Sequence, residues 1–199
     1  SLGKIDNAKK IINSALKFYP RNLLLNQYKH DLNEKKNVLL YDCNKEQHVI
    51  AEILYITANA LSSQSIYPLS NFYLNLAKYL NKDFVSYDTL LAENFYKIDN
   101  LKKAKKIYEN LSKYGEAYNW YSSKQLARIF IDEENKHEAL KLLSKSYNDL
   151  FNKKIYETFD YAEFLKNNEK FEESIPLYTK VIDQLKIEHP LYAEATDGR

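Results

Sequence analysis

Residues 90–111 read LLAENFYKIDNLKKAKKIYENL, and this stretch decides the fold. It holds two short amphipathic helical patterns separated by a polar turn, with one small residue, Ala92 or Ala104, in each pattern. Both alanines recur 35 residues later, as Ala127 and Ala139. A small residue lets two helix backbones approach closely, so small residues at a fixed spacing predict stacked helical hairpins.

The same spacing extends in both directions along the chain. One further period leads to Ala162 and Ser174, and Ala58 lies 34 residues before Ala92. We therefore expect an all-α chain with four hairpins over residues 48–187, at about 51–84, 85–119, 120–154 and 155–187. The flanking segments are predicted to be one or more partial repeats over 1–34, an irregular insert near 35–47 and the start of a further, truncated repeat over 188–199.

Composition is consistent with an ordered helical protein. Hydrophobic residues make up 45% of the 199 residues, and three glycines and four prolines are too few for the many turns of a β sandwich. The net charge of +2 comes from 29 basic and 27 acidic residues mixed along the chain, which disfavours nucleic acid and direct membrane contact. Neither a membrane-spanning stretch nor a targeting signal is expected.

The positions around the alanines resemble the tetratricopeptide repeat (TPR) family. First helices carry a large residue, a small one and then a large apolar residue three further on. The three examples are Leu91-Ala92 with Phe95, Leu126-Ala127 with Phe130, and Tyr161-Ala162 with Leu165. Second helices continue the pattern with Ala104 and Tyr108, Ala139 and Leu143, and Ser174 and Tyr178. The consensus tryptophan position departs from the family, with Leu54, Asp88, Ser123 and Thr158.

This resemblance, which includes similarity to bacterial multi-repeat proteins, implies a TPR-like α-solenoid. Such a fold is a right-handed superhelical array of antiparallel helical hairpins that acts as a protein-interaction scaffold. The expected partner is a protein or peptide bound on the concave face, in the bacterial cytoplasm or periplasm. The sequence leaves the oligomeric state open.

In TPR arrays the first helix of each hairpin lines the concave face, so the stripe opposite the alanines is the candidate binding surface. Its members are Tyr55 and Asn59; Glu93 and Tyr96; Tyr121, Lys124 and Arg128; and Tyr156, Phe159 and Glu163. The stripe continues to Ile131. Tyrosine gives broad contact area at low entropy cost, which suits a peptide groove. The 18 tyrosines also fit the composition bias of a low-G+C genome.

Lys124 and Arg128 form the stripe's basic pair, one helical turn apart. They could anchor a carboxylate of the partner, or they could belong to a solvated charged face together with Glu93 and Glu163. A different hypothesis concerns residues 38–41, Val-Leu-Leu-Tyr, which are apolar between polar flanks. This segment is either a strap lying against the array or a plain surface connector.

Catalysis finds little support in the sequence. The four histidines are isolated, Cys43 is alone, and no glycine-rich phosphate loop or nucleophile elbow is present. We therefore expect no catalytic residues, no cofactor and no metal site. Two other functions remain as alternatives: a pentatricopeptide-like RNA-binding repeat, whose period is also about 35 residues, and an accessory subunit of a cell-envelope or polysaccharide assembly.

Overall fold

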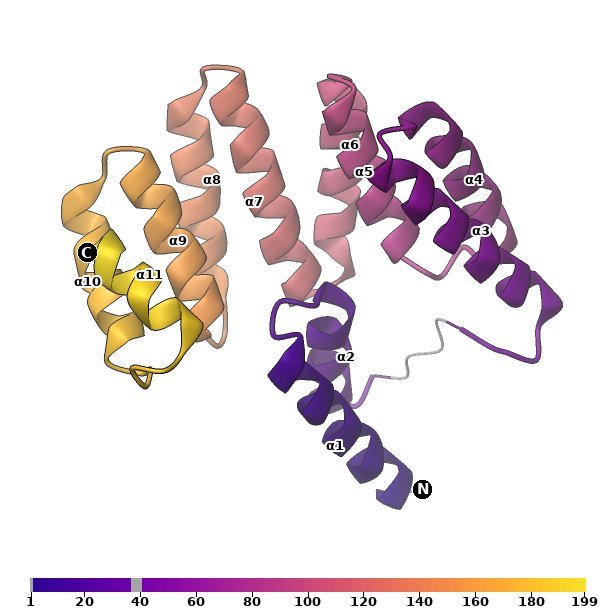
Figure 1. The fold of residues 1–199 in the computed structure, drawn as a ribbon, viewed down its shortest axis with the longest axis horizontal. Helices are drawn as coiled ribbons and strands as arrows, with labels where there is room; N and C mark the ends of the chain where they lie inside the picture. Colours follow the sequence, from indigo (N-terminus) through magenta and orange to yellow (C-terminus); the bar gives the residue numbers. More distant parts are fainter. Residues whose placement is uncertain (1, 37–40) are drawn as a thin grey trace. The chain divides into compact units, whose positions relative to one another are not determined.

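The computed structural model describes residues 2–36 and 41–199, and the regular elements in these ranges are helices (Figure 1). In chain order they are α1 (Leu2–Phe18), α2 (Leu23–Asn33), α3 (Glu46–Ser63), α4 (Tyr67–Leu80), α5 (Ser86–Lys97), α6 (Leu101–Leu111), the 3-10 helix η1 (Ser112–Tyr114), α7 (Glu116–Asp132), α8 (Lys136–Asp149), α9 (Ile155–Asn167), α10 (Phe171–Ile182) and α11 (Pro190–Gly198).

The chain divides into two compact units, one up to Ser122 and one from Ser123 onward. The division falls inside α7. In the first unit α3 pairs with α4 and α5 with α6, and in the second α9 pairs with α10, each pair as an antiparallel hairpin (Figure 1). The final helix, α11, packs against α9 and α10.

The repeated small residues lie at the centre of the packing. Ala58, Ala92, Ala104, Ala127, Ala139 and Ala162 are all fully buried, and Ser174 is 1% exposed. In the first unit Ala58 packs among larger apolar side chains such as Leu74 and Tyr87, and in the second Ala162 packs among Tyr178 and Val181. The spacing read from the sequence therefore marks the residues that allow the helices to approach.

The hairpin turns also repeat, although none of them contains glycine. The second residue after α3, α5, α7 and α9 has a positive φ, and these residues are Ser65 (62°), Asp99 (58°), Glu134 (60°) and Glu169 (65°). In each turn the next backbone N–H donates to a carbonyl five residues earlier, as from Asn100 to Phe95 (2.8 Å). This bond closes the helix end but places an L-residue in the left-handed region, where glycine is usual.

Replacing one of these turn residues with glycine is expected to stabilise the protein. Glu134 is exposed, and its left-handed backbone costs about 1–2 kcal/mol that glycine would not incur. Glycine loses more entropy on folding, so the net gain for Glu134→Gly should be about 0.5–1 kcal/mol in the free energy of unfolding, measured by urea titration. Glu133→Gly, one residue earlier, is the control and should destabilise. A loss of stability in Glu134→Gly would contradict this account of the turn.

A different backbone feature joins α2 to the start of α7 in the first unit. Gly115 has φ 141° and ψ 178°, a conformation that side chains rarely adopt. The Gln27 side chain from α2 packs against it and is 4% exposed. Gln27 Oε1 accepts a hydrogen bond from the backbone N–H of Ala117 (3.2 Å), while its Nε2 donates to Asp31 Oδ1 (2.8 Å). Gln27 therefore caps the N-terminus of α7.

The insert between α2 and α3 contains no regular element among its described residues. Of the proposed strap, Val38, Leu39 and Leu40 lie outside the described residues. Beyond them the Tyr41 ring lies 6.1 Å from the His48 ring between centroids, and the Asp42 N–H donates to His48 Nδ1 (3.1 Å). His48 thus has a structural partner at the start of α3.

Candidate functional site

Several residues of the stripe join successive first helices. From α7, the Tyr121 hydroxyl donates to Glu93 on α5 (2.5 Å), and its ring meets Tyr108 edge to face at 6.0 Å. Burial, together with the Tyr108 and Glu93 neighbours, raises the pKa of the Tyr121 phenol far above its usual value. On the same helix, Lys124 Nζ lies 2.5 Å from Asp160 Oδ2 on α9. Part of the stripe therefore fixes one hairpin against the next.

Two aromatic residues of the stripe lie largely within the packing. Tyr55 is half-buried, with its ring 5.6 Å from Phe84 and 5.4 Å from Tyr87 between centroids. Phe159 is 6% exposed and packs in one cluster with Leu191 of α11. The cause is the same in both cases, because the next hairpin or helix covers the stripe. Phe159 offers little surface to a partner.

The remaining stripe residues are spread over both units. Asn59 is exposed on α3, where its Nδ2 donates to the Tyr55 carbonyl (3.1 Å). Tyr96 is half-buried at the end of α5. Tyr156 is half-buried on α9, with its ring 6.2 Å from His189.

In the second unit, part of the stripe lines a pocket of about 410 Å³. Three members of the candidate surface, Lys124, Arg128 and Glu163, contribute to it, as does Ile131. The other lining residues are Leu143 from α8, then Asp160, Phe164 and Asn167 from α9, and Asn168, which directly follows α9. The pocket combines apolar side chains with two cations and two carboxylates, which is the composition of a site that fixes a ligand's orientation by a few polar groups.

Most of the pocket's charges are already held by protein partners. Lys124 pairs with Asp160. Glu163 accepts hydrogen bonds from Lys166 Nζ (2.7 Å) and from the Tyr178 hydroxyl. Burial would raise the pKa of the Glu163 carboxyl, but these two donors outweigh it, so its pKa lies below the usual value. Glu163 is therefore a fixed negative charge at neutral pH. Of the pocket's two cations, Arg128 is more exposed than Lys124.

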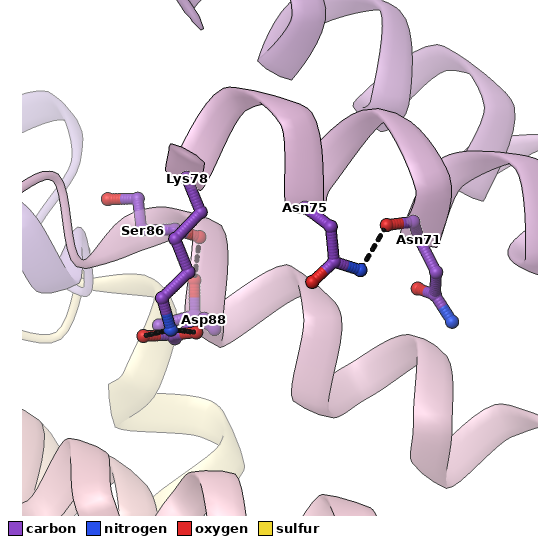
Figure 2. Close-up of polar contacts among 6 residues, drawn as sticks. Asn71, Asn75, Lys78, Ser86 and Asp88 are labelled. Carbon is purple, nitrogen blue, oxygen red and sulfur yellow. Dashed lines mark hydrogen bonds and ion pairs between the residues drawn. The ribbon is translucent and has the colours of Figure 1, made fainter. Parts of the chain in front are cut away.

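A second pocket, of about 320 Å³, lies in the first unit beside an ion pair. Figure 2 shows Lys78 of α4 reaching Asp88 of α5, with Nζ 2.6 Å and 2.8 Å from the two carboxylate oxygens. Ile107, Asn110 and Tyr114 complete much of its lining. Because Lys78 contacts both oxygens of Asp88, this pair mainly joins the two hairpins. The larger pocket, in the second unit, is therefore the candidate site.

The stripe did not include the α9 residues that complete the larger pocket. Asp160 lies one residue after Phe159 and Phe164 one after Glu163, so both fall just outside the stripe's spacing. The sequence did contain a signal for Asp160, because Lys124 and Asp160 are oppositely charged and lie 36 residues apart, close to one repeat. Opposite charges at that spacing place an ion pair between neighbouring first helices.

Among the described residues, 2–36 and 41–199, no group of three or more His, Cys, Asp or Glu side chains is placed to hold a metal ion. Within the same ranges, none of the helices has the length and apolarity needed to cross a bilayer.

Comparison with known proteins identifies the fold. No protein-family model and no curated protein sequence matches the chain. Its structure is similar to the crystal structure of nearly identical TPR-like repeats of a putative kinesin light chain from Podosopora anserina. The two share 13% sequence identity with a TM-score of 0.53, over 74% of this chain and 82% of that one. This confirms the all-α repeat fold predicted from the alanine spacing, and the TPR-like character that the family resemblance implies.

Proposed function

We propose that this chain is a protein-interaction scaffold that binds a peptide segment of its partner in the pocket between α7 and α9. Helical-repeat folds generally serve as scaffolds, because their stacked hairpins present an extended surface without catalytic machinery. The observation that carries the proposal is the pocket of about 410 Å³, where apolar residues lie next to Arg128.

The chemistry of the pocket defines the class of peptide. Ile131 and Phe164 provide an apolar wall for one hydrophobic side chain. Arg128 has five N–H donors, more than a single contact uses, and can bind a carboxylate of the peptide. Asp160 and Glu163 balance the pocket's two cations, so the pocket lacks the excess positive charge that binding along a phosphate backbone requires. We therefore propose not an RNA but a peptide with an acidic residue next to an apolar one.

Reversing the charge at Arg128 is expected to weaken peptide binding. Peptides selected from a random library against the wild-type protein should combine an acidic and an apolar residue. Arg128→Glu should weaken their binding by about tenfold or more in fluorescence polarisation, because it replaces a charge-assisted hydrogen bond with repulsion.

The matched control is Lys141→Glu, since Lys141 is an exposed cation on α8 that does not line the pocket. Both variants should retain the wild-type circular dichroism spectrum. Equal binding by wild type and Arg128→Glu would overturn the proposed site. Selective binding of RNA homopolymers at physiological salt, with no peptide selected, would overturn the proposed function.

A further inference from the structure

The α3/α4 hairpin of the first unit carries six large apolar side chains that are exposed. We call this set the α3/α4 apolar face: Ile50, Ile53 and Ile56 on α3, and Leu69, Phe72 and Tyr79 on α4. Their exposed fractions run from 43% to 78%. Helix α5 packs against both α3 and α4 (Figure 1). Single exposed apolar residues are ordinary, but six on one hairpin are not.

The face is also depleted of charge. Residues 47–79 contain only two of the chain's acidic and basic residues, Glu52 and Lys78, although such residues make up 28% of the sequence. Both side chains are half-buried, and Lys78 is paired with Asp88. An uncharged surface of this length lacks the solvated groups that normally keep a helix face in water.

Comparison among the repeats shows that the apolar residues of α4 are specific to this hairpin. We compare positions by counting from the left-handed turn residue of each hairpin. In the next hairpin, the positions of Leu69, Phe72 and Tyr79 hold three exposed lysines, two in α6 and one in η1. These are Lys103, Lys106 and Lys113. In α8 the same positions hold Glu138, Lys141 and Asn148. Solvent-facing positions elsewhere in the repeat are therefore apolar in α4.

The α3 residues of the face occupy positions that make hairpin-to-hairpin contacts in the next repeat. Counted in the same way, Ile50, Ile53 and Ile56 correspond to Phe84, Tyr87 and Leu90. Those three residues pack into the core cluster shared with α3 and α4. The α3 residues of the α3/α4 apolar face therefore occupy positions that, in the next repeat, receive another helical hairpin.

We propose that the α3/α4 apolar face is a homodimer interface, in which the same face of a second copy of this chain packs against it. At about 200 Å² for a fully exposed large side chain, the six residues expose on the order of 700 Å², close to the roughly 800 Å² that each partner buries in a standard interface. A two-fold contact sets each face against its own copy. An uncharged face meets no like-charge repulsion in that arrangement, whereas the lysine-bearing face of α6 would.

The association state of the whole 199-residue chain tests this inference. Light scattering after size exclusion and sedimentation velocity at 1–100 μM, about the range for such an interface, should give a monomer–dimer equilibrium that stops at the dimer. Phe72→Glu and Ile53→Glu should each weaken dimerisation by about 100-fold or more, since each buries a carboxylate in an apolar contact.

Phe171→Glu is the matched control, because Phe171 on α10 is 56% exposed and Phe72 is 57% exposed. It should leave the dimer intact. If a glutamate variant loses its helical circular dichroism signal, Tyr79→Ser replaces it, since Tyr79 is 78% exposed and contributes mainly to the surface. A monomeric wild type at about 100 μM, a dimer that survives both glutamate variants, or growth beyond the dimer with concentration would overturn the inference. None of these outcomes depends on the pocket between α7 and α9.

Discussion

Gly115→Ala is expected to lower the free energy of unfolding by about 3–5 kcal/mol. The backbone at Gly115, with φ 141°, belongs to a region that is essentially restricted to glycine and costs other residues about 1–3 kcal/mol. A Cβ there would also overlap Gln27 Nε2, so the Gln27 side chain would have to move. Its hydrogen bonds to Ala117 and Asp31 would then be lost, at about 1 kcal/mol each. Urea denaturation followed by circular dichroism measures the effect.

A double-mutant cycle with Gln27→Ala separates the two causes of this loss. Gln27→Ala removes the steric overlap and the cap but leaves the backbone of residue 115 unchanged. In that background Gly115→Ala should cost only the backbone component, about 1–3 kcal/mol, so the two changes together should cost less than their sum. Strictly additive effects would mean that Gln27 and residue 115 are not in contact, contrary to the structure.

The helices were predictable because the decisive signals are local and repeated. A buried alanine such as Ala92 must recur wherever two helices cross, and polar turns such as the one at Asp99 mark the hairpin ends. The turn geometry was less accessible. Asp99 and Glu134 adopt a left-handed conformation that sequence reasoning assigns to glycine. The backbone hydrogen bond that closes each turn compensates for the strain. It requires no particular residue type, so the sequence does not indicate it.

The candidate site was only partly predictable, because a repeat period does not say which helix face its neighbour covers. Lys124 and Arg128 do line the pocket, where α7 lies next to α9. Phe159 is the equivalent of Lys124 in the next hairpin, 35 residues later. It is buried because α11 packs over α9. The same position is thus open in one hairpin and closed in the next, depending on whether a later helix packs over it. Periodicity carries no information about that difference.

Asn94 is a buried polar residue whose structural role is difficult to predict from the sequence. A polar residue in an amphipathic helix is usually solvent-facing, yet Asn94 is 1% exposed. In the next two first helices its register position holds Ile129 and Phe164, which was the available signal that the position is internal. Its Nδ2 donates to Ser70 Oγ (2.8 Å) and Asn71 Oδ1 (2.9 Å), and its Oδ1 accepts from Ser62 Oγ (2.6 Å). One side chain therefore joins α3, α4 and α5.

Asn94→Leu is expected to destabilise the protein by about 2–4 kcal/mol, although leucine is apolar and similar in volume. The substitution leaves buried polar atoms of Ser70 and Asn71 without their Asn94 partner, and an unsatisfied buried group costs about 1–3 kcal/mol. Adding Ser70→Ala removes one of these groups, so the double variant should lose less than the sum of the two single changes. Urea titration of the three variants measures this coupling.

The matched control for Asn94→Leu is Asn75→Leu on α4. Asn75 is exposed, and its Nδ2 donates to the Asn71 carbonyl within the same helix (2.7 Å; Figure 2). Its replacement should change the free energy of unfolding by no more than about 0.5 kcal/mol. A stable Asn94→Leu would mean that apolar burial outweighs the polar network at this position. The contacts argue the reverse, because both hydrogen bonds that Asn94 donates end on Ser70 and Asn71, which the hairpins keep from water.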